Sequence, residues 1–302
     1  MLTPVRDRHT FSRREKRDYI EAELCLMELP ATLGLPGARN RFEELQSVHQ
    51  HQTRITHRVG AFLPFHRLLM YAHEHLLREE CGYRGAQPYW DETRDAGRFT
   101  QSVVLEPITG FGGDGMGDEG CIADGPFANY TNNLGPGYRI EEHCIYRSIN
   151  DTLSRMASQR FIDECNEETT FEDFWPCSEQ EPHNGGHAGI GGKMLDPIAS
   201  PGDPIFYLHH TFLDKVYWDW QARDLPARLT EIGGQNTQAE SWTPPPPDAL
   251  VPPPDWPPQV PQGDPGNVTT LSHILNMWGV IEDAVVADVM DIRGPLLCYE
   301  YV

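Results

Sequence analysis

Apolar residues recur at helical spacing in several segments of the chain. Residues 12–29 place apolar side chains on one face, begin with a serine and stop before Pro30, so they are expected to form a helix. Residues 40–58 show the same periodicity. Gly60 interrupts this run, and we expect a new helix from about Pro64 to Glu80.

Two later segments also have a helical pattern, Glu141–Cys165 and Asp203–Arg223. The second begins with Asp203 as the expected N-cap and Pro204 at the first helical position, where its missing N–H costs nothing. Between the early and late helices, Cys81–Pro136 is rich in Gly, Pro, Asn and Asp. Such a composition predicts long irregular loops, and the whole pattern predicts a mainly α fold with few short strands.

The length and composition favour one domain. A chain of 302 residues with 39% apolar content can bury one large core or two modest ones. Residues 243–266 are so rich in proline that composition alone would make them a linker, but the stretch after them is too short for a second domain. We therefore expect a single domain over residues 1–302, with residues 243–266 as an extended loop on its surface.

The charge of the chain excludes some partners. It carries 45 acidic and 24 basic residues, a formal net charge of −21, and the acidic residues are spread along the chain. Nucleic acid and anionic membrane surfaces are therefore poor partners. No run of apolar residues is long enough to span a bilayer, and the N-terminal residues are too polar for a secretory signal.

The cysteines indicate an oxidising compartment. All seven are scattered without C-x-x-C pairs, a spacing typical of disulfides rather than of zinc sites. The odd number implies a free thiol, a partner outside the chain, or a chain boundary. Three N-x-[ST] sequons, at Asn129, Asn150 and Asn267, also fit a secreted glycoprotein that has lost its signal peptide. The alternative is a cytosolic protein with seven buried thiols.

Histidines are concentrated in two segments, each with three imidazoles that could hold one metal ion. Two all-nitrogen, three-coordinate sites favour copper over calcium, magnesium or zinc. Three ligands also leave coordination positions open for chemistry, whereas a structural zinc site needs a fourth ligand. The candidate ligands are His49, His57 and His66 in the first segment, and His183, His187 and either His209 or His210 in the second.

The spacing of these histidines suggests how a helical fold brings them together. His183 and His187 are four residues apart, so on a helix they face the same way and can share one ion. His57 and His66 are nine residues apart and would lie on opposite faces of one continuous helix. The break at Gly60 allows one to end a helix and the other to begin the next. We therefore predict a central four-helix bundle that houses a pair of metal ions.

Two motifs around the histidines resemble those of the tyrosinase and catechol oxidase (polyphenol oxidase) family. The first, H-x4-F-L-P-F-H-R followed by Glu74, is met by His57, Phe62, Phe65, His66 and Arg67. The second, D-P-x-F-Y-x2-H-x3-D, is met by Asp203, Pro204, Phe206, His210 and Asp214. Residues 80–91, 121–130 and 296–302 also resemble the short secreted fungal polyphenol oxidases, so the resemblance covers nearly the whole chain.

The resemblance implies a coupled centre of two copper ions. It assigns copper A to His49, His57 and His66, and copper B to His183, His187 and His210. His49 is preferred to His51 because fungal members place their first ligand eight residues before the second. Ile55 and Ser47 stand where many relatives have a cysteine that forms a thioether with a copper A histidine, so we expect no such crosslink.

The resemblance also implies an activity. We expect oxidation of o-diphenols by O2 to o-quinones, with weaker o-hydroxylation of monophenols, by a secreted and monomeric enzyme. Glu179 and Asn184 occupy positions that in relatives help to take the proton of the phenol. The motif spacing makes Asp214 and Glu74 candidates to orient the imidazoles.

Two further expectations follow from the family. The Tyr299–Tyr301 element commonly ends the catalytic domain of relatives, so we expect no C-terminal shielding domain. The alternative function is that of a haemocyanin-like oxygen carrier, which uses the same type of six-histidine site without turnover.

Overall fold

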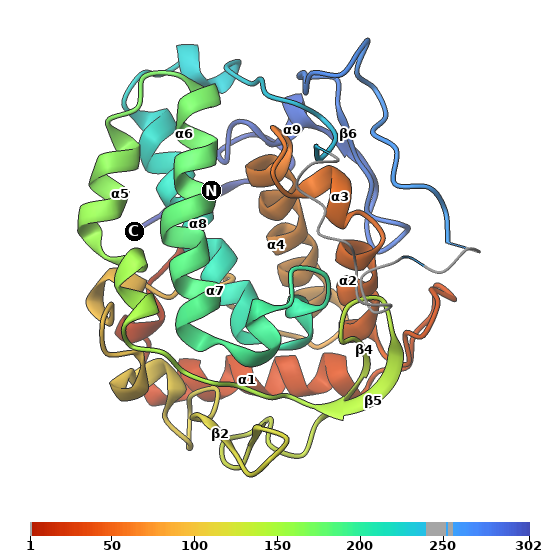
Figure 1. The fold of residues 1–302 in the computed structure, drawn as a ribbon, viewed down its shortest axis with the longest axis vertical. Helices are drawn as coiled ribbons and strands as arrows, with labels where there is room; N and C mark the ends of the chain where they lie inside the picture. Colours follow the sequence, from red (N-terminus) through yellow and green to blue (C-terminus); the bar gives the residue numbers. More distant parts are fainter. Residues whose placement is uncertain (1, 240–251, 253–255) are drawn as a thin grey trace.

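A bundle of helices forms the centre of the molecule in a computed structural model that describes residues 2–239, 252 and 256–302 (Figure 1). α4 (Phe62–Glu79) packs directly against α8 (Ile205–Ala222), and α2 (Arg41–Gln50) packs against α4. The expected mainly α fold with a central four-helix bundle is confirmed. The bundle consists of α2 (Arg41–Gln50), α4 (Phe62–Glu79), α8 (Ile205–Ala222) and a composite helix in which α6 (Phe171–Ser178) continues through a π-helical turn (Glu179–His183) into α7 (Asn184–Ile190).

The first predicted helix is present as α1, Arg13–Glu28, which runs beneath the bundle in Figure 1. Ser12 is its N-cap, and its hydroxyl accepts the N–H of Glu15 while the Glu15 carboxylate accepts the N–H of Ser12. This reciprocal pair satisfies two amides that lack a partner within the helix. α1 buries residues such as Tyr19 and Leu26 against α2 and α4.

The predicted helix over 40–58 is in fact two helices. α2 ends at Gln50, and a single turn, α3 (Thr53–Thr56), follows after the non-helical Gln52. His57 is extended and Arg58 has a φ of 54°, so the chain changes direction before α4 begins at Phe62. The direction of the His57 side chain is therefore set by this break in the chain and not by its position on the face of a continuous helix.

The prediction of a helix over Glu141–Cys165 is wrong. Its first part is β5 (Ile140–Cys144), which pairs antiparallel with β4 (Thr131–Leu134), and only α5 (Gln159–Asn166) at its end is an α-helix. Between them the backbone follows the end of α7: Asn150 donates its N–H to the Gly189 carbonyl over 2.8 Å. Pairing with distant segments therefore replaces local helical hydrogen bonds.

The last bundle helix begins one residue later than expected. Pro204 occupies the N-cap of α8, and Asp203, the predicted cap, lies before it. The Asp203 carboxylate is fully buried and accepts two hydrogen bonds of 2.8 Å from the Arg147 guanidinium. It also accepts the N–H of Ile205 over 3.2 Å, so it serves the helix start while it holds Arg147.

The rest of the described chain forms short elements around the bundle. β1 (Thr3–Val5) and β8 (Tyr299–Tyr301) pair in parallel and join the N-terminal and C-terminal segments. The region 81–136 is largely irregular, as predicted. The remaining strands and helices are β1 (Thr3–Val5), β2 (Gly115–Met116), β3 (Cys121–Ile122), β6 (Ile274–Leu275), β7 (Ala284–Val285), α9 (Val286–Val289), β8 (Tyr299–Tyr301), and 3-10 helices at Arg8–Thr10, Glu92–Arg94, Phe99–Gln101, Val103–Leu105, Leu153–Ala157, Gly192–Leu195, Ser200–Gly202 and Ala227–Leu229.

Three disulfides crosslink these elements, as the scattered cysteines predicted. They are Cys25–Cys81, Cys121–Cys144 and Cys165–Cys177. The seventh cysteine is Cys298.

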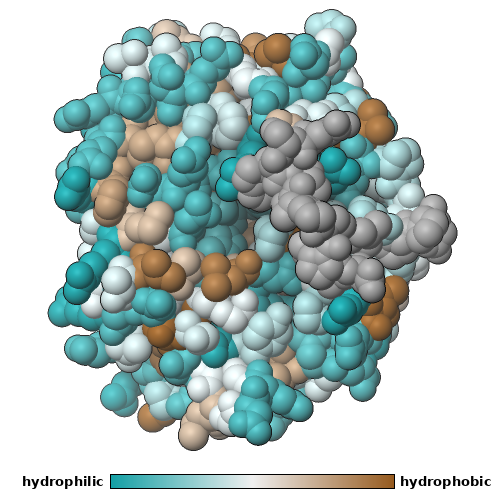
Figure 2. Space-filling view, viewed as in Figure 1, coloured by the Kyte–Doolittle hydropathy of each residue, from teal (hydrophilic) through white to brown (hydrophobic). Residues whose placement is uncertain are grey.

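Much of the proline-rich segment 243–266 lies outside the described residues, so its course as a whole is still a prediction. In its described part, Trp256 is buried and stacks on His51 of the bundle, with ring centroids 4.1 Å apart. None of the helices in the described parts of the chain is long and apolar enough to cross a membrane. On the face in Figure 2, hydrophobic residues form small separate groups among hydrophilic ones.

Candidate metal centre

The first histidine cluster combines three separate helical segments. His49 comes from the last turn of α2, His57 from the residue after α3, and His66 from the second turn of α4. Their ring centroids lie 4.8 to 5.5 Å apart, and all three side chains are buried. His51 is not part of this cluster, because its ring faces Trp256 and its Nδ1 contacts the Ser47 carbonyl.

The second cluster joins the composite helix to α8. His183 ends the π-helical turn, His187 lies one turn further in α7, and their ring centroids are 4.4 Å apart. Both His209 and His210 of α8 reach this group. One nitrogen from each of the four imidazoles lies within 4.8 Å of the others, and all four side chains are buried.

The two clusters face each other across the bundle. The rings of His66 and His210 are stacked, with centroids 4.1 Å apart. Phe206 of α8 is fully buried and lies 5.4 Å from the His49 ring and 4.1 Å from the His210 ring, so it borders both clusters. Phe62 of α4 likewise lies 4.8 Å from the rings of both His66 and His183. Aromatic side chains therefore enclose the space in which two ions would lie.

Most of these imidazoles are fixed in the form that binds metal. For the first five candidate ligands, Nδ1 contacts a backbone carbonyl, so the N–H is expected on Nδ1 and the Nε2 lone pair is left for an ion. The Nε2 atoms of His49, His66 and His183 are indeed buried without a hydrogen-bond partner in the described structure. The pairs are His49 with Ile198, His57 with Thr53, His66 with Phe62, His183 with Glu179 and His187 with Met194.

Burial keeps these imidazoles neutral. Desolvation lowers the pKa of His57 to about 4 and that of His187 to about 3. The pKa values of His49, His66 and His183 also fall well below the usual value, first because of burial and then because neighbouring histidines repel a second proton. Neutral imidazole is the form that binds copper, so both donor sets fit such an ion.

His209 and His210 have different surroundings. The Nε2 of His210 lies 3.3 Å from the Nε2 of His187, inside the cluster, while its Nδ1 is buried without a hydrogen-bond partner in the described structure. The Nδ1 of His209 lies 2.6 Å from the Glu92 carboxylate. The geometry brings both histidines to the second cluster, so the choice of His210 as the ligand is still a prediction.

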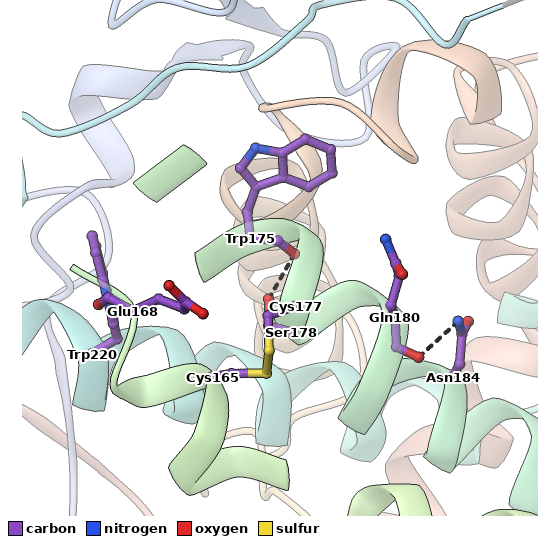
Figure 3. Close-up of a disulfide and its surroundings, with 8 residues drawn as sticks. All are labelled: Cys165, Glu168, Trp175, Cys177, Ser178, Gln180, Asn184 and Trp220. Carbon is purple, nitrogen blue, oxygen red and sulfur yellow. Dashed lines mark hydrogen bonds between the residues drawn. A yellow bond between two sulfur atoms is a disulfide. The ribbon is translucent and has the colours of Figure 1, made fainter. Parts of the chain in front are cut away.

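The two predicted proton-handling residues line one cavity of about 330 Å³, and Asn184 is the residue after His183. The Glu179 carboxylate is buried and accepts the backbone N–H of Arg58 over 2.8 and 3.1 Å. Burial raises its pKa to about 8, although Arg58 opposes the shift. Asn184 donates its side-chain amide to the Gln180 carbonyl over 3.0 Å (Figure 3).

A disulfide supports this wall of the cavity. Cys177, two residues before Glu179, is joined to Cys165 of α5, and Figure 3 shows the bridge to one side of Gln180 and Asn184, below Trp175. The bridge links α5 to α6, the first part of the composite helix.

Two predicted supporting roles are wrong. Asp214 contacts Arg67, Tyr299 and Tyr301 rather than a histidine of either cluster. Glu74 accepts hydrogen bonds from the Gln87 N–H and from Arg78, also away from the histidines. The sequence spacing was consistent with a role in orienting the imidazoles, but the hydrogen bonds of both carboxylates go to other residues.

The sequence reasoning also missed two residues at the site. Glu92 follows the Tyr-Trp-Asp segment in a region predicted as loop, and it is fully buried against His209. Gly186 separates the candidate ligands His183 and His187, and its close packing had no sequence signal beyond the glycine itself.

Comparison with known proteins now identifies the family. The family model described as the common central domain of tyrosinase matches residues 39–223, more than half of the chain and the whole of both histidine clusters. The chain belongs to the tyrosinase family.

Relatives support this tyrosinase-family assignment over most of the chain. The tyrosinase-like protein phomQ2 of Diaporthe leptostromiformis is 31% identical over 300 residues, which cover 95% of this chain and 70% of that protein. A polyphenol oxidase variant from Thermothelomyces thermophila has a similar structure, with a TM-score of 0.85 and 28% identity over 100% of this chain and 89% of that one.

A more distant structural relative is a functional unit of octopus haemocyanin. Its TM-score is 0.52 at 21% identity, over 73% of this chain and 53% of that one, so the likeness shows the fold alone. The tyrosinase fold and the two histidine clusters fit a coupled dicopper centre, and the protein is an oxidoreductase of the tyrosinase family.

Proposed function

We propose that this protein is a polyphenol oxidase that oxidises o-diphenols to o-quinones with O2 and hydroxylates monophenols more slowly. The observation that carries the proposal is the pair of facing clusters of buried imidazoles, with the His66 and His210 rings 4.1 Å apart. Two three-imidazole sets leave coordination positions free on both ions. Copper bound there supplies O2 binding and the transfer of electrons from the phenol.

The proposed ligands are those that the family motifs indicate. Copper A is held by His49, His57 and His66, and copper B by His183, His187 and His210. The Nδ1 contacts of the first five support this assignment, because a metal-binding histidine almost always has its other ring nitrogen bound to a carbonyl or carboxylate.

The residues of the chain keep the site dry and ordered. Phe62 and Phe206 are fully buried beside the histidines and exclude water from the space between the clusters. The anchored imidazoles need little reorganisation when an ion binds, since backbone carbonyls already hold them.

Glu179 is proposed to accept the proton of the phenol, with Asn184 as a hydrogen-bonding neighbour. Both side chains line the cavity of about 330 Å³. Asn184 directly follows the proposed ligand His183, so this cavity is the proposed approach of the phenol. The buried carboxylate has the raised pKa typical of a group that exchanges protons near neutral pH. Monophenols need this deprotonation before hydroxylation, so the role should matter most for them.

We also propose that the enzyme is a secreted, monomeric glycoprotein. The three disulfides are typical of an oxidising compartment. Asn129, Asn150 and Asn267, the three sequon asparagines, are all exposed and therefore accessible to glycosylation.

The direct test is oxygen consumption by the copper-loaded protein with catechol. An oxidase should consume one O2 for every two catechols and form two o-quinones and two waters. A haemocyanin-like carrier should instead bind O2 reversibly without quinone formation, and that result would overturn the proposed function. His66→Ala, which removes a proposed ligand, should abolish quinone formation, whereas His51→Ala should retain most of it because His51 lies outside the cluster.

A further inference from the structure

Glu92 is an acidic residue deep in the protein. It begins a 3-10 helix in the long loop region, its side chain is fully buried, and its Oε1 lies 2.6 Å from the Nδ1 of His209. Its Oε2 is also buried and has no hydrogen-bond partner in the described structure. A buried carboxylate with so few partners is costly, so its contact with His209 needs an explanation.

The partner of Glu92 faces the second cluster. His209 is buried, and its Nε2 has no hydrogen-bond partner in the described structure. One of its ring nitrogens lies within 4.8 Å of nitrogens of His183, His187 and His210. A carboxylate beside Nδ1 favours a hydrogen on that nitrogen, which leaves the lone pair of His209 on Nε2.

The pair also packs against the turn that carries two proposed ligands. Gly186 lies between His183 and His187, and a Cβ built on it would overlap the His209 ring and lie 2.8 Å from Oε2 of Glu92. The absence of a side chain at Gly186 therefore allows the Glu92–His209 pair to pack directly against the backbone between His183 and His187.

We propose that Glu92 is a positioning residue for copper B. Through His209 it fixes the turn between His183 and His187, two of the proposed copper B ligands. The proposal rests on the dicopper centre and not on the oxidation of phenols. It can therefore be tested by metal binding alone, and it would survive if the protein bound O2 without turnover.

The chain offers a matched control. Glu23 and His73 form another buried carboxylate–imidazole pair, 3.1 Å apart, in which both side chains are fully buried. The His73 ring stacks on Tyr207, and His73 belongs to neither metal cluster. Loss of Glu23 should therefore disturb the core as much as loss of Glu92, without direct contact with proposed ligands.

The experiment compares Glu92→Leu with Glu23→Leu. Both variants are loaded with copper, and the copper content per chain, the rate of copper transfer to a chelator and the melting temperature are measured. Glu92→Leu should release one of its two copper ions about 10- to 100-fold faster than the wild type, the usual range for loss of a group that orients a ligand. Glu23→Leu should keep two firmly bound ions despite a lower melting temperature.

Two outcomes would overturn the proposal. One is a Glu92→Leu protein that releases both ions at the wild-type rate. The other is faster release from both variants in proportion to their loss of melting temperature, because that pattern shows only general destabilisation.

If Glu92→Leu does not fold, substitutions of neighbouring glycines decide the question. Gly186→Ala should weaken the binding of one copper ion, because the new methyl group collides with His209. Gly185→Ala, on the same helix, would instead meet the backbone of Ala157 and Met156, away from the pair. It should cost stability but keep both ions. Equal loss of copper from both glycine variants, or from neither, would refute the role of the pair.

Discussion

Asp214→Asn should strongly destabilise the fold. Asp214 of α8 is buried beside Arg67, the residue after the proposed ligand His66, and the Arg67 side chain is fully buried. The Arg67 guanidinium donates to the Asp214 carboxylate and, over 2.9 Å, to the Val289 carbonyl. The same carboxylate accepts the hydroxyl of Tyr299, and this network joins α4, α8 and the C-terminal strand.

The structure sets the size of the effect. Removing one partner of a buried ion pair costs about 3–5 kcal/mol, because the remaining charge has no counter-charge. Asp214→Asn leaves the buried Arg67 guanidinium without a counter-charge and weakens the hydrogen bonds from Tyr299 and Tyr301. We therefore expect a loss of about 4 kcal/mol. The double variant Arg67→Met, Asp214→Leu removes both charges and should lose clearly less than the sum of its single substitutions.

Urea unfolding of the copper-free protein at pH 7, followed by circular dichroism, measures these free energies. Copper is left out because bound ligand adds to the apparent stability of every variant. A loss below about 1 kcal/mol for Asp214→Asn would refute the reasoning, since that is the value of an exposed ion pair. Strict additivity in the double variant would also refute it, because the two charges would then not interact.

Three further predictions concern catalysis, pH and the disulfide beside the site. Glu179→Gln should lower monophenol hydroxylation more than catechol oxidation. The control Glu181→Gln should change neither activity, because Glu181 lies outside the cavity lining. An equal fall of both activities in Glu179→Gln would contradict the proton-accepting role. Burial opposes the charge of His9, but its hydrogen bonds to Asp7 and Asp95 raise its pKa to about 9. Protonated His9 therefore stabilises the folded state fully below pH 6.5, and this contribution is lost as the pH rises through 9. The wild type should therefore lose up to about 3 kcal/mol more than His9→Gln between pH 6 and 10, and parallel curves would contradict this. Replacing both Cys165 and Cys177 by serine should cost about 2–4 kcal/mol of unfolding free energy, and an unchanged urea midpoint would contradict it.

Local sequence signals predicted the parts of the fold that local physics decides. The serine that begins residues 12–29 predicted the start of α1, and the glycine and proline content of residues 81–136 predicted irregular structure. The helix predicted over Glu141–Cys165 was wrong, because β5 pairs with β4 and the following backbone pairs with α7. Periodicity within one segment cannot reveal such distant pairing.

In the candidate site too, local sequence signals predicted some residues, while contacts between distant segments determined the others. Histidine spacing and the family motifs selected the histidines that the structure brings into two clusters. The supporting residues were harder to predict, because they depend on contacts between distant segments. Asp214 proved to face Arg67, and Glu92, 117 residues before His209 in the sequence, had no motif that linked it to the site.

The most direct test of the dicopper account is elemental analysis of a reconstituted sample that oxidises catechol. The two clusters predict two copper ions per chain, with activity rising in step with copper and absent from the metal-free protein. Full activity with a single copper ion per chain, or activity that requires zinc instead, would contradict the account.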